Sequence, residues 1–238
     1  MAFRILIIGV SGFLGRTLAP AFQQQGWEVS GQDLAGTTFP DLPRGSQYNQ
    51  PLADTPFWRK VIAKQNLVLN LAGNLQGNRR SRYLEANVQV PRTLLSLTES
   101  ISTPVPIIHI SSVAALGPTA KEYPLPESAP CRPVSLYGKT KQMGEAVFTN
   151  SPPSSPVLIV RLPSIYGPGD RCFFDLFRMA RAGFFVKLCT RNKAFQLLYR
   201  DDFVNLLIEL IGLIKQEQSP GFSSEPFRNL PRLSRDCS

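Results

Sequence analysis

The first 33 residues constrain the fold of this chain more than any other stretch. Residues 3–8 form a short and nearly continuous apolar run, as expected of a strand that is buried on both faces of a parallel sheet. Three glycines follow at intervals of three residues, namely Gly9, Gly12 and Gly15. Apolar residues then recur at helical spacing, and a second strand is expected over residues 27–33. The order predicts a strand, a glycine-rich turn, a helix and a second strand.

This glycine-rich turn has the features of a phosphate-binding site. Backbone N–H groups at the start of a helix point outward with the positive end of the helix dipole, and residues without a Cβ let a diphosphate approach them closely. The residues expected to form the cradle are Gly9, Ser11, Gly12, Phe13, Leu14 and Gly15. The turn therefore predicts a nucleotide with a diphosphate as ligand.

Asp33 ends the second strand, 18 residues after Gly15. Dinucleotide-binding folds place an acidic residue at this distance, against the adenosine ribose. A carboxylate there accepts hydrogen bonds from both ribose hydroxyls and repels a 2′-phosphate. We therefore predict NAD rather than NADP as the cofactor.

The rest of the chain alternates between strand and helix patterns. Strands are expected over 66–71, 105–110 and 156–162, and helices over 57–64, 80–100 and 135–149. A long loop rich in Pro, Gly and Thr precedes residue 56 and has room for a short strand. This alternation predicts an α/β fold, a doubly wound parallel sheet of Rossmann type, with ligands at the carboxyl ends of the strands.

Length and charge narrow the possible partners. A chain of 238 residues is long enough for one sizeable core and a small lobe. The net charge of +9 is scattered and no nucleic-acid-binding motif accompanies it, so we expect an anionic small molecule rather than a nucleic acid. No apolar stretch reaches membrane-spanning length. The cysteines are too widely spaced for zinc or for a stapled secreted domain, so we expect reduced thiols in a cytoplasmic protein.

Tyr137 and Lys141 lie four residues apart in the helical pattern of 135–149, and so share one face of the helix. A free tyrosine titrates near pH 10. A fixed lysine charge and the positive nicotinamide ring are expected to lower the pKa of Tyr137 and make it an acid/base for a hydroxyl or carbonyl group. Ser112 follows the preceding strand and can orient the same substrate oxygen. His109, the only histidine, lies inside that strand and is expected to be a packed core residue.

With these residues in place, the chain resembles the extended short-chain dehydrogenases/reductases, the NAD-dependent epimerase/dehydratase family, over residues 3 to about 215. The segments that carry the resemblance are the G-x-x-G-x-x-G turn, Asn70-Leu71-Ala72-Gly73, residues 85–93 with Asn87, residues 110–117, residues 161–169 and residues 199–203. The resemblance implies that Ser112, Tyr137 and Lys141 are catalytic and that Lys141 also holds the nicotinamide ribose. It implies further cofactor contacts from Leu71, Ala72, Gly73, Asn87 and Leu162.

The resemblance implies hydride transfer to or from the nicotinamide, with a nucleotide sugar as the leading substrate class. Arginines available for its diphosphate are Arg178, Arg181 and Arg191, although solvated surface charges are an equally good interpretation. A reductase or dehydrogenase of 3β-hydroxysteroid or dihydroflavonol type is an alternative, and so is an NAD-binding protein without catalysis. Relatives commonly dimerise through two long helices, which correspond to 80–100 and 135–149 here.

The sequence departs from the family pattern in several places. Either Gln50 or Asp54 stands where relatives place an acid on the adenine, and Ser164 replaces the usual asparagine on the substrate side. Relatives also continue well beyond this length. We therefore expect a dinucleotide-binding core over 1–165, a partial substrate lobe over 166–215 and a poorly ordered tail over 216–238. The phenylalanines of 173–185 are expected to pack helices together.

Overall fold

A six-stranded parallel sheet forms the centre of the molecule in the computed structural model, which describes residues 2–34, 36–43, 45–73, 79–118, 125–150, 155–171, 173–184 and 196–217. Its strands are β1 (Arg4–Ile8), β2 (Glu28–Gln32), β3 (Gln47–Tyr48), β4 (Leu67–Asn70), β5 (Ile107–Ser112) and β6 (Val157–Leu162). The spatial order is β3-β2-β1-β4-β5-β6, so the order reverses between β1 and β4. In doubly wound sheets, ligands bind at such a reversal.

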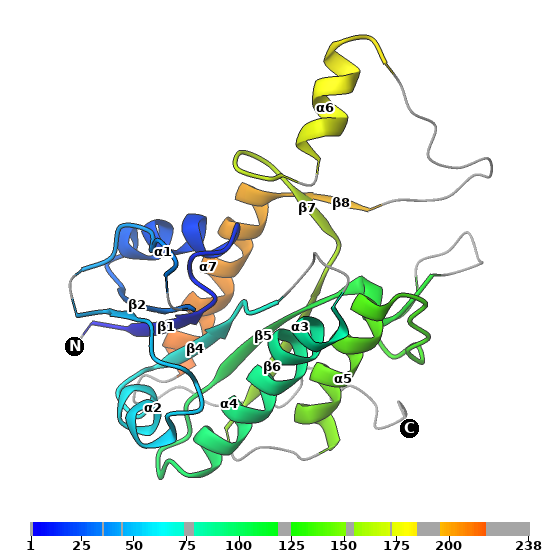
Figure 1. Cartoon of the computed structure of the whole chain (residues 1–238). Coiled ribbons are helices and arrows are strands. Elements are labelled where there is room, and N and C mark those ends of the chain that lie inside the picture. The colour runs from blue at the N-terminus through cyan, green and yellow to red at the C-terminus, as the bar shows by residue number, and fades with distance from the viewer. Residues whose placement is uncertain are drawn as a thin grey trace.

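Helices cover both faces of this sheet (Figure 1). The helical segments are α1 (Gly15–Gln24), α2 (Thr55–Ile62), α3 (Arg80–Leu84), the π-helix η1 (Glu85–Gln89), α4 (Val90–Glu99), the 3-10 turn η2 (Val113–Ala115), α5 (Leu136–Asn150), α6 (Phe174–Arg181) and α7 (Arg200–Glu217). One face packs on α1 and α7, and the other packs on α2, α4 and α5. A second, two-stranded parallel sheet pairs β7 (Ser164–Tyr166) with β8 (Leu197–Tyr199).

Alternate side chains of β1 point into two separate hydrophobic cores. Ile5 and Ile7 join the core beneath α1 and α7, whereas Leu6 and Ile8 join the core beneath α2, α4 and α5. Because side chains alternate along a strand, a strand that is covered on both sides needs apolar residues at every position. The uninterrupted apolar run of the sequence therefore has its explanation here, and the predicted doubly wound sheet is confirmed.

The helical pattern of 80–100 is interrupted by a π-turn that the sequence did not predict. Val90 N–H donates to Glu85 O, five residues earlier, and Pro91 has no N–H to bond the carbonyl of Asn87. That carbonyl packs against α5, where a Cβ on Gly144 would lie only 2.2 Å from it. The bulge and the glycine together bring the two helices into close contact.

Other expectations need adjustment. Ser112 is the last residue of β5 rather than a residue beyond the strand, because β5 continues past the expected end at residue 110. Residues 216–217 belong to α7, and the rest of the predicted tail lies outside the described residues. The expected packing of the phenylalanines is wrong for α6, because Phe174 and Phe177 are 59% and 51% exposed. No helix in the described part of the chain combines the length and apolar character needed to cross a membrane.

Candidate active site

The glycine turn joins β1 to α1 at the reversal of strand order. Gly9 adopts a φ of +81°, and a Cβ there would lie 3.0 Å from the backbone nitrogen of Ala72. A Cβ on Gly15 would lie 2.3 Å from Val10 O, so this position admits glycine alone. The first helical hydrogen bond runs from Arg16 N to Gly12 O at 3.0 Å.

The amides of Phe13, Leu14 and Gly15 precede that first bond and therefore lie outside the hydrogen-bond ladder of α1. Such amides carry the positive end of the helix dipole and suit a diphosphate. Gly12 is exposed beside them, so its lack of a Cβ leaves the approach open. The structure thus gathers the predicted cradle residues in one turn.

Asp33 lies directly after β2 and beside this turn. Its Oδ2 accepts a hydrogen bond from Ser11 N at 2.8 Å and another from the Ser11 hydroxyl, while its Oδ1 accepts from Leu34 N at 2.8 Å. A carboxylate has about four acceptor positions, so these contacts orient the group and leave room for a ribose hydroxyl. The position agrees with the predicted role of Asp33.

The segment after β4 forms a wall on the opposite side of β1 from Asp33. Asn70 Oδ1 accepts from Ala72 N at 3.1 Å, and Asn70 Nδ2 bonds His109 Nδ1 at 2.9 Å. Leu71 N donates to Ile8 O at 2.9 Å, which ties this wall to β1. Burial and, to a smaller extent, the nearby Lys141 together lower the pKa of His109 to about 3, so the ring stays neutral. The prediction that His109 is a core residue is confirmed.

Tyr137 is the second residue of α5, and its side chain reaches the end of β5. Its hydroxyl forms a side-chain hydrogen bond with Ser112, whose Oγ also accepts from Ala114 N at 3.2 Å. Burial raises the pKa of Tyr137, the bond with Ser112 lowers it, and the neighbouring Tyr83 raises it, with a net rise. The predicted lowering of this pKa is wrong for the unliganded chain, because burial outweighs the favourable contacts. The phenol therefore keeps its proton at neutral pH.

Lys141 lies one helical turn after Tyr137 and is buried against β5. Its Nζ donates to Ile110 O at 3.0 Å. Burial lowers the pKa of Lys141 to about 8, although the carboxylate of Glu145 raises it. A Cβ on Gly73 would lie 3.1 Å from Nζ, so glycine at 73 leaves space for the ammonium group. Lys141 therefore reaches the wall formed by residues 71–73.

The π-turn places Asn87 at the same spot. Its side chain is fully buried, and Nδ2 donates to Thr140 Oγ1 at 2.9 Å. Thr140 Oγ1 in turn donates to the carbonyl of Tyr137 at 3.0 Å. The Oδ1 of Asn87 lies 3.5 Å from a Cβ built on Gly73. Asn87, Gly73 and Lys141 are thus brought together from three separate elements.

The remaining candidates occupy more peripheral positions. Leu162 is buried at the end of β6 and pairs in register with Ser112. Asp54 accepts from Phe57 N at 3.4 Å and caps α2, whereas Gln50 is exposed. Ser164 lies on β7 in register with Leu197.

Of the arginines considered for a diphosphate, Arg178 pairs with Asp175 at 3.2 Å on exposed α6, Arg181 is exposed, and Arg191 lies outside the described residues. Cys131 is the one cysteine whose placement is described. Among the described residues, no cluster of His, Cys, Asp or Glu is suited to hold a metal ion.

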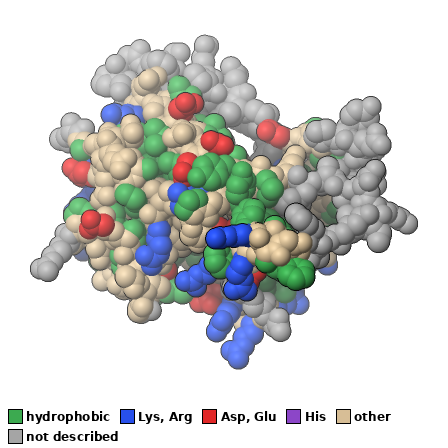
Figure 2. Space-filling view, turned by 90° about the horizontal axis from the view of Figure 1, so that it is seen from above, with side chains coloured by type: hydrophobic (Ala, Val, Ile, Leu, Met, Phe, Trp, Pro, Cys, Tyr) green, Lys and Arg blue, Asp and Glu red, His purple; other side chains and the backbone are tan. Residues whose placement is uncertain are grey.

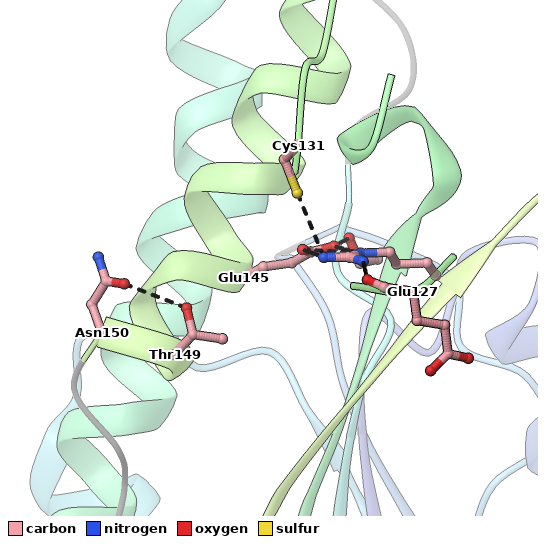
Figure 3. Close-up of polar contacts among 7 residues, drawn as sticks. Glu127, Cys131, Glu145, Thr149 and Asn150 are labelled. Atoms are coloured by element: carbon pink, nitrogen blue, oxygen red, sulfur yellow. Dashed lines mark hydrogen bonds and ion pairs between the residues drawn. The ribbon is translucent and has the colours of Figure 1, made fainter. Parts of the chain in front are cut away.

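The sequence did not predict a buried ion pair that involves Glu145, one helical turn after Lys141. Glu145 and Arg161 join at 2.7 Å, and the Ser111 hydroxyl donates to the same carboxylate. Figure 3 shows the Glu145 side chain extending from α5 into this cluster, with Cys131 bonded from the other side. The spacing of Tyr137, Lys141 and Glu145 at four-residue intervals was the available signal, because it extends one helix face by a further turn.

Several characterised proteins are similar to this chain. The dTDP-6-deoxy-L-talose 4-dehydrogenase (NAD(P)(+)) of Kitasatospora kifunensis is 24% identical over 171 residues, which are 70% of this chain and 54% of that protein. The ceramide reductase of Caulobacter vibrioides is 24% identical and matches 89% of this chain and 63% of that protein. A dTDP-4-dehydrorhamnose reductase of Mycolicibacterium smegmatis is 26% identical. The chain spans between 54% and 63% of the length of these relatives.

Solved structures agree with the fold. An NAD-dependent NDP-hexosamine 5,6-dehydratase of tunicamycin biosynthesis superposes with a TM-score of 0.70 at 28% identity, covering 87% of this chain and 71% of that one. The UDP-glucuronic acid 4-epimerase of Bacillus cereus, solved with UDP-glucuronic acid and NAD, gives 0.71 at 22% identity, with 88% and 73% covered. Residues 5–221 match the family described as the NAD dependent epimerase/dehydratase family. The glycine turn, the acid after β2 and the Ser112–Tyr137–Lys141 arrangement all fit that match, and the chain belongs to this family of extended short-chain dehydrogenases/reductases.

Proposed function

We propose that this chain binds NAD and catalyses an epimerase- or dehydratase-type reaction on a nucleotide sugar, with Tyr137 as the acid/base. The observation that carries the proposal is the hydrogen bond between the Tyr137 hydroxyl and Ser112, with Lys141 one turn away, at the same sheet edge as the glycine turn. Proton transfer and hydride transfer to one carbon–oxygen bond need these groups side by side.

The described residues fit the cofactor from one end to the other. The amides of 13–15 and the dipole of α1 suit the diphosphate, and Asp33 suits the adenosine ribose. Leu71, Ala72 and Gly73 follow β4 on the other side of β1 from Asp33. We propose that they contact the cofactor together with Asn87 and Leu162. Lys141 lies where it can hold the nicotinamide ribose. NAD would supply the hydride acceptor, and the chain supplies binding, orientation and the proton.

The ionisation of Tyr137 suggests how the proton moves. Because burial raises its pKa, the phenol is protonated before the reaction and can donate to a substrate oxygen that gains negative charge. Ser112 bonds the same hydroxyl and so holds the donor and the substrate oxygen in line. A bound oxidised nicotinamide carries positive charge, which favours the phenolate needed for the reverse transfer.

The substrate class rests on the relatives and on charge. Two of the curated relatives are named for dTDP-linked sugars. The net charge of +9 suits an anionic substrate. Figure 2 shows Lys and Arg side chains gathered on the face of the molecule seen from above Figure 1, and Arg178 and Arg181 on α6 are exposed. We propose residues 166–215 as the substrate side and 1–165 as the cofactor side.

A reductase is the second candidate. A tyrosine that holds its proton is suited to protonate the oxygen of a reduced carbonyl, and two relatives are named as reductases. Steady-state oxidation of added NADH by the enzyme would favour this candidate, because an epimerase regenerates its cofactor in each turnover. A non-catalytic role is disfavoured by the intact contacts of Ser112, Tyr137 and Lys141. Dimerisation through the helical segments 80–100 and 135–149 and a cytoplasmic location stay predictions.

The cofactor assignment is tested by titrating NAD into the protein and into a Gly12→Ala variant by calorimetry. A Cβ at 12 would lie 3.3 Å from Gly9 O on the approach to the cradle, so we expect NAD to bind at least about tenfold more weakly. Gly212→Ala is the matched control, because a Cβ there meets nothing within 4 Å. The absence of NAD binding to the unaltered protein would contradict the proposal.

The acid/base assignment is tested with Tyr137→Phe on a panel of dTDP- and UDP-sugars. Removing the hydroxyl leaves the ring in place, so NAD binding is expected to persist while turnover falls by about 10³-fold. Equal turnover by the variant and the unaltered protein would remove Tyr137 from the mechanism.

A further inference from the structure

The end of β5 is matched to α5 residue by residue. Three consecutive strand residues each bind one of three helix residues that are spaced one turn apart. The pairs are Ile110 with Lys141, Ser111 with Glu145, and Ser112 with Tyr137. Two of these pairs contain the proposed catalytic groups. The third, through Glu145, has no place in proton or hydride transfer, and its function needs another explanation.

Glu145 is the most firmly held of the three helix residues. Its side chain is 5% exposed, and its carboxylate accepts from Arg161 Nε at 3.0 and 3.1 Å and from another guanidinium nitrogen at 2.7 Å. The Ser111 hydroxyl adds a further bond. A buried carboxylate whose two oxygens both bind one guanidinium has a strongly fixed geometry. Removing either partner would leave the other as an uncompensated buried charge.

Arg161 extends the same lock to the segment that leads into α5. It comes from β6, and it donates to Glu127 O at 3.2 Å and to Cys131 Sγ at 3.6 Å. In Figure 3 the Glu145 carboxylate lies between α5 and the strands, with Cys131 and Glu127 on either side of the cluster. One carboxylate therefore ties together α5, β5, β6 and the residues that precede Tyr137.

The same carboxylate acts on the charge of Lys141. Two titratable groups interact with the charge of Lys141, namely Glu145 from α5 and His109 from β5. Arg161 from β6 pairs with Glu145, and Tyr137, one helical turn before Lys141, neighbours Tyr83 from α3. His109 is neutral at physiological pH, because burial holds its pKa near 3. Burial also lowers the pKa of Lys141 to about 8, and Glu145 opposes this effect.

We propose that Glu145 is a positioning residue that fixes the position of α5 relative to β5. It thereby places Tyr137 and Lys141 opposite Ser112 and Ile110. This inference rests on the proposed function, because the exact position of α5 matters only if Tyr137 transfers a proton and Lys141 is charged. Its geometry and its effect on Lys141 do not require a substrate.

The test compares Glu145→Gln with the double variant Glu145→Gln/Arg161→Gln in the full 238-residue chain. The single variant leaves the Arg161 guanidinium buried without its counter-charge, so its melting temperature is expected to fall. The double variant removes both charges and is expected to regain most of that loss. Glu99→Gln, which removes an exposed carboxylate from the end of α4, is the control for a simple change of net charge.

The decisive measurement is the titration of Lys141, followed by NMR in chains with ¹³C-labelled lysine and identified by the signal that Lys141→Arg removes. Loss of the carboxylate lowers the pKa of a neighbouring ammonium, so we expect the pKa of Lys141 to be about one pH unit lower in Glu145→Gln. In the double variant we expect this pKa to return part of the way, because the positive charge of Arg161 is removed as well. NAD affinity is expected to fall severalfold in both. Glu99→Gln is expected to match the unaltered chain.

A role confined to folding predicts the opposite result for the double variant, namely that the NAD affinity returns to normal together with the melting temperature. That result, or an unchanged pKa of Lys141 in Glu145→Gln, overturns the inference. Failure of the proposed function is recognised separately: the unaltered chain would not bind NAD, while the titration of Lys141 would still report on Glu145.

Discussion

Two helices that each carry apolar residues on one face differ in burial in this molecule. The apolar residues Leu18 and Phe22 of α1 are fully buried against the six-stranded sheet, whereas the described residues of α6 include none that is buried, and Phe174 and Phe177 are more than half exposed. In Figure 1, α1 lies on the sheet and α6 projects beyond β7 and β8. The difference teaches that an apolar helix face reports the capacity to pack, and that the partner decides whether packing occurs.

The same contrast separates the two halves of the proposed site. Every group assigned to NAD or to proton transfer lies on the six-stranded sheet, its flanking helices or the turns between them. The arginines considered for the substrate lie on exposed α6. We therefore expect substitutions in the cofactor half to change both stability and NAD binding, and matched substitutions around α6 to change stability little.

Gly15→Ala should give the largest effect. The new Cβ would lie 2.3 Å from Val10 O and within 2.6 Å of two further backbone atoms, so the turn itself must move. We expect a loss of at least about 4 kcal/mol in the free energy of unfolding, measured by urea denaturation. Gly183→Ala, where a φ of +82° is strained but nothing lies within 4 Å, should cost about 1 kcal/mol. Equal losses would remove the distinction between the halves.

Leu69→Ala and Phe177→Ala compare two large apolar side chains. Leu69 is fully buried in the central strand β4, so its truncation should cost about 3 kcal/mol through lost burial and the cavity left behind. Phe177 is 51% exposed, although it lies 6.2 Å from the ring of Tyr166, and its truncation should cost about 0.5 kcal/mol. A large cost for Phe177→Ala would mean that α6 is covered in the assembled protein.

His109 should give the cofactor half a pH dependence. Its pKa is lowered from 6.5 to about 3 in the folded chain, so the unfolded chain binds more protons between these values. Stability is fully present above pH 6.5 and is lost as the pH falls, by about 1.4 kcal/mol for each pH unit. His109→Gln should flatten the slope between pH 6.5 and 5, and because His109 is the only histidine, no other imidazole obscures the result. An unchanged slope would contradict the neutral buried state.

Much of the fold and of the site could be predicted because the signals are local. The apolar run of β1, the glycine spacing and Asp33 lie within one short stretch, and Tyr137 and Lys141 are separated by a single helical turn. Short-range geometry then fixes their relation before any tertiary contact is known.

What could not be predicted depends on contacts between distant segments. The net rise in the pKa of Tyr137 comes from burial, which a sequence pattern does not reveal. The pairing of Glu145 with Arg161 requires knowledge that β6 lies beside β5 at that level. The exposure of Phe177 follows from the absence of a partner in the described structure, while its sequence context resembles that of a packed helix.

Pro91 influences the orientation of site residues although it lies outside the site. An α-helix advances by about 100° per residue, so one residue gained or lost in a turn changes the direction of everything before it. By denying the Asn87 carbonyl an amide partner, Pro91 sets the rotational phase of the segment that carries Asn87 and Tyr83 toward α5. A proline that takes no part in the chemistry thus helps to determine which side chains of this helix face α5.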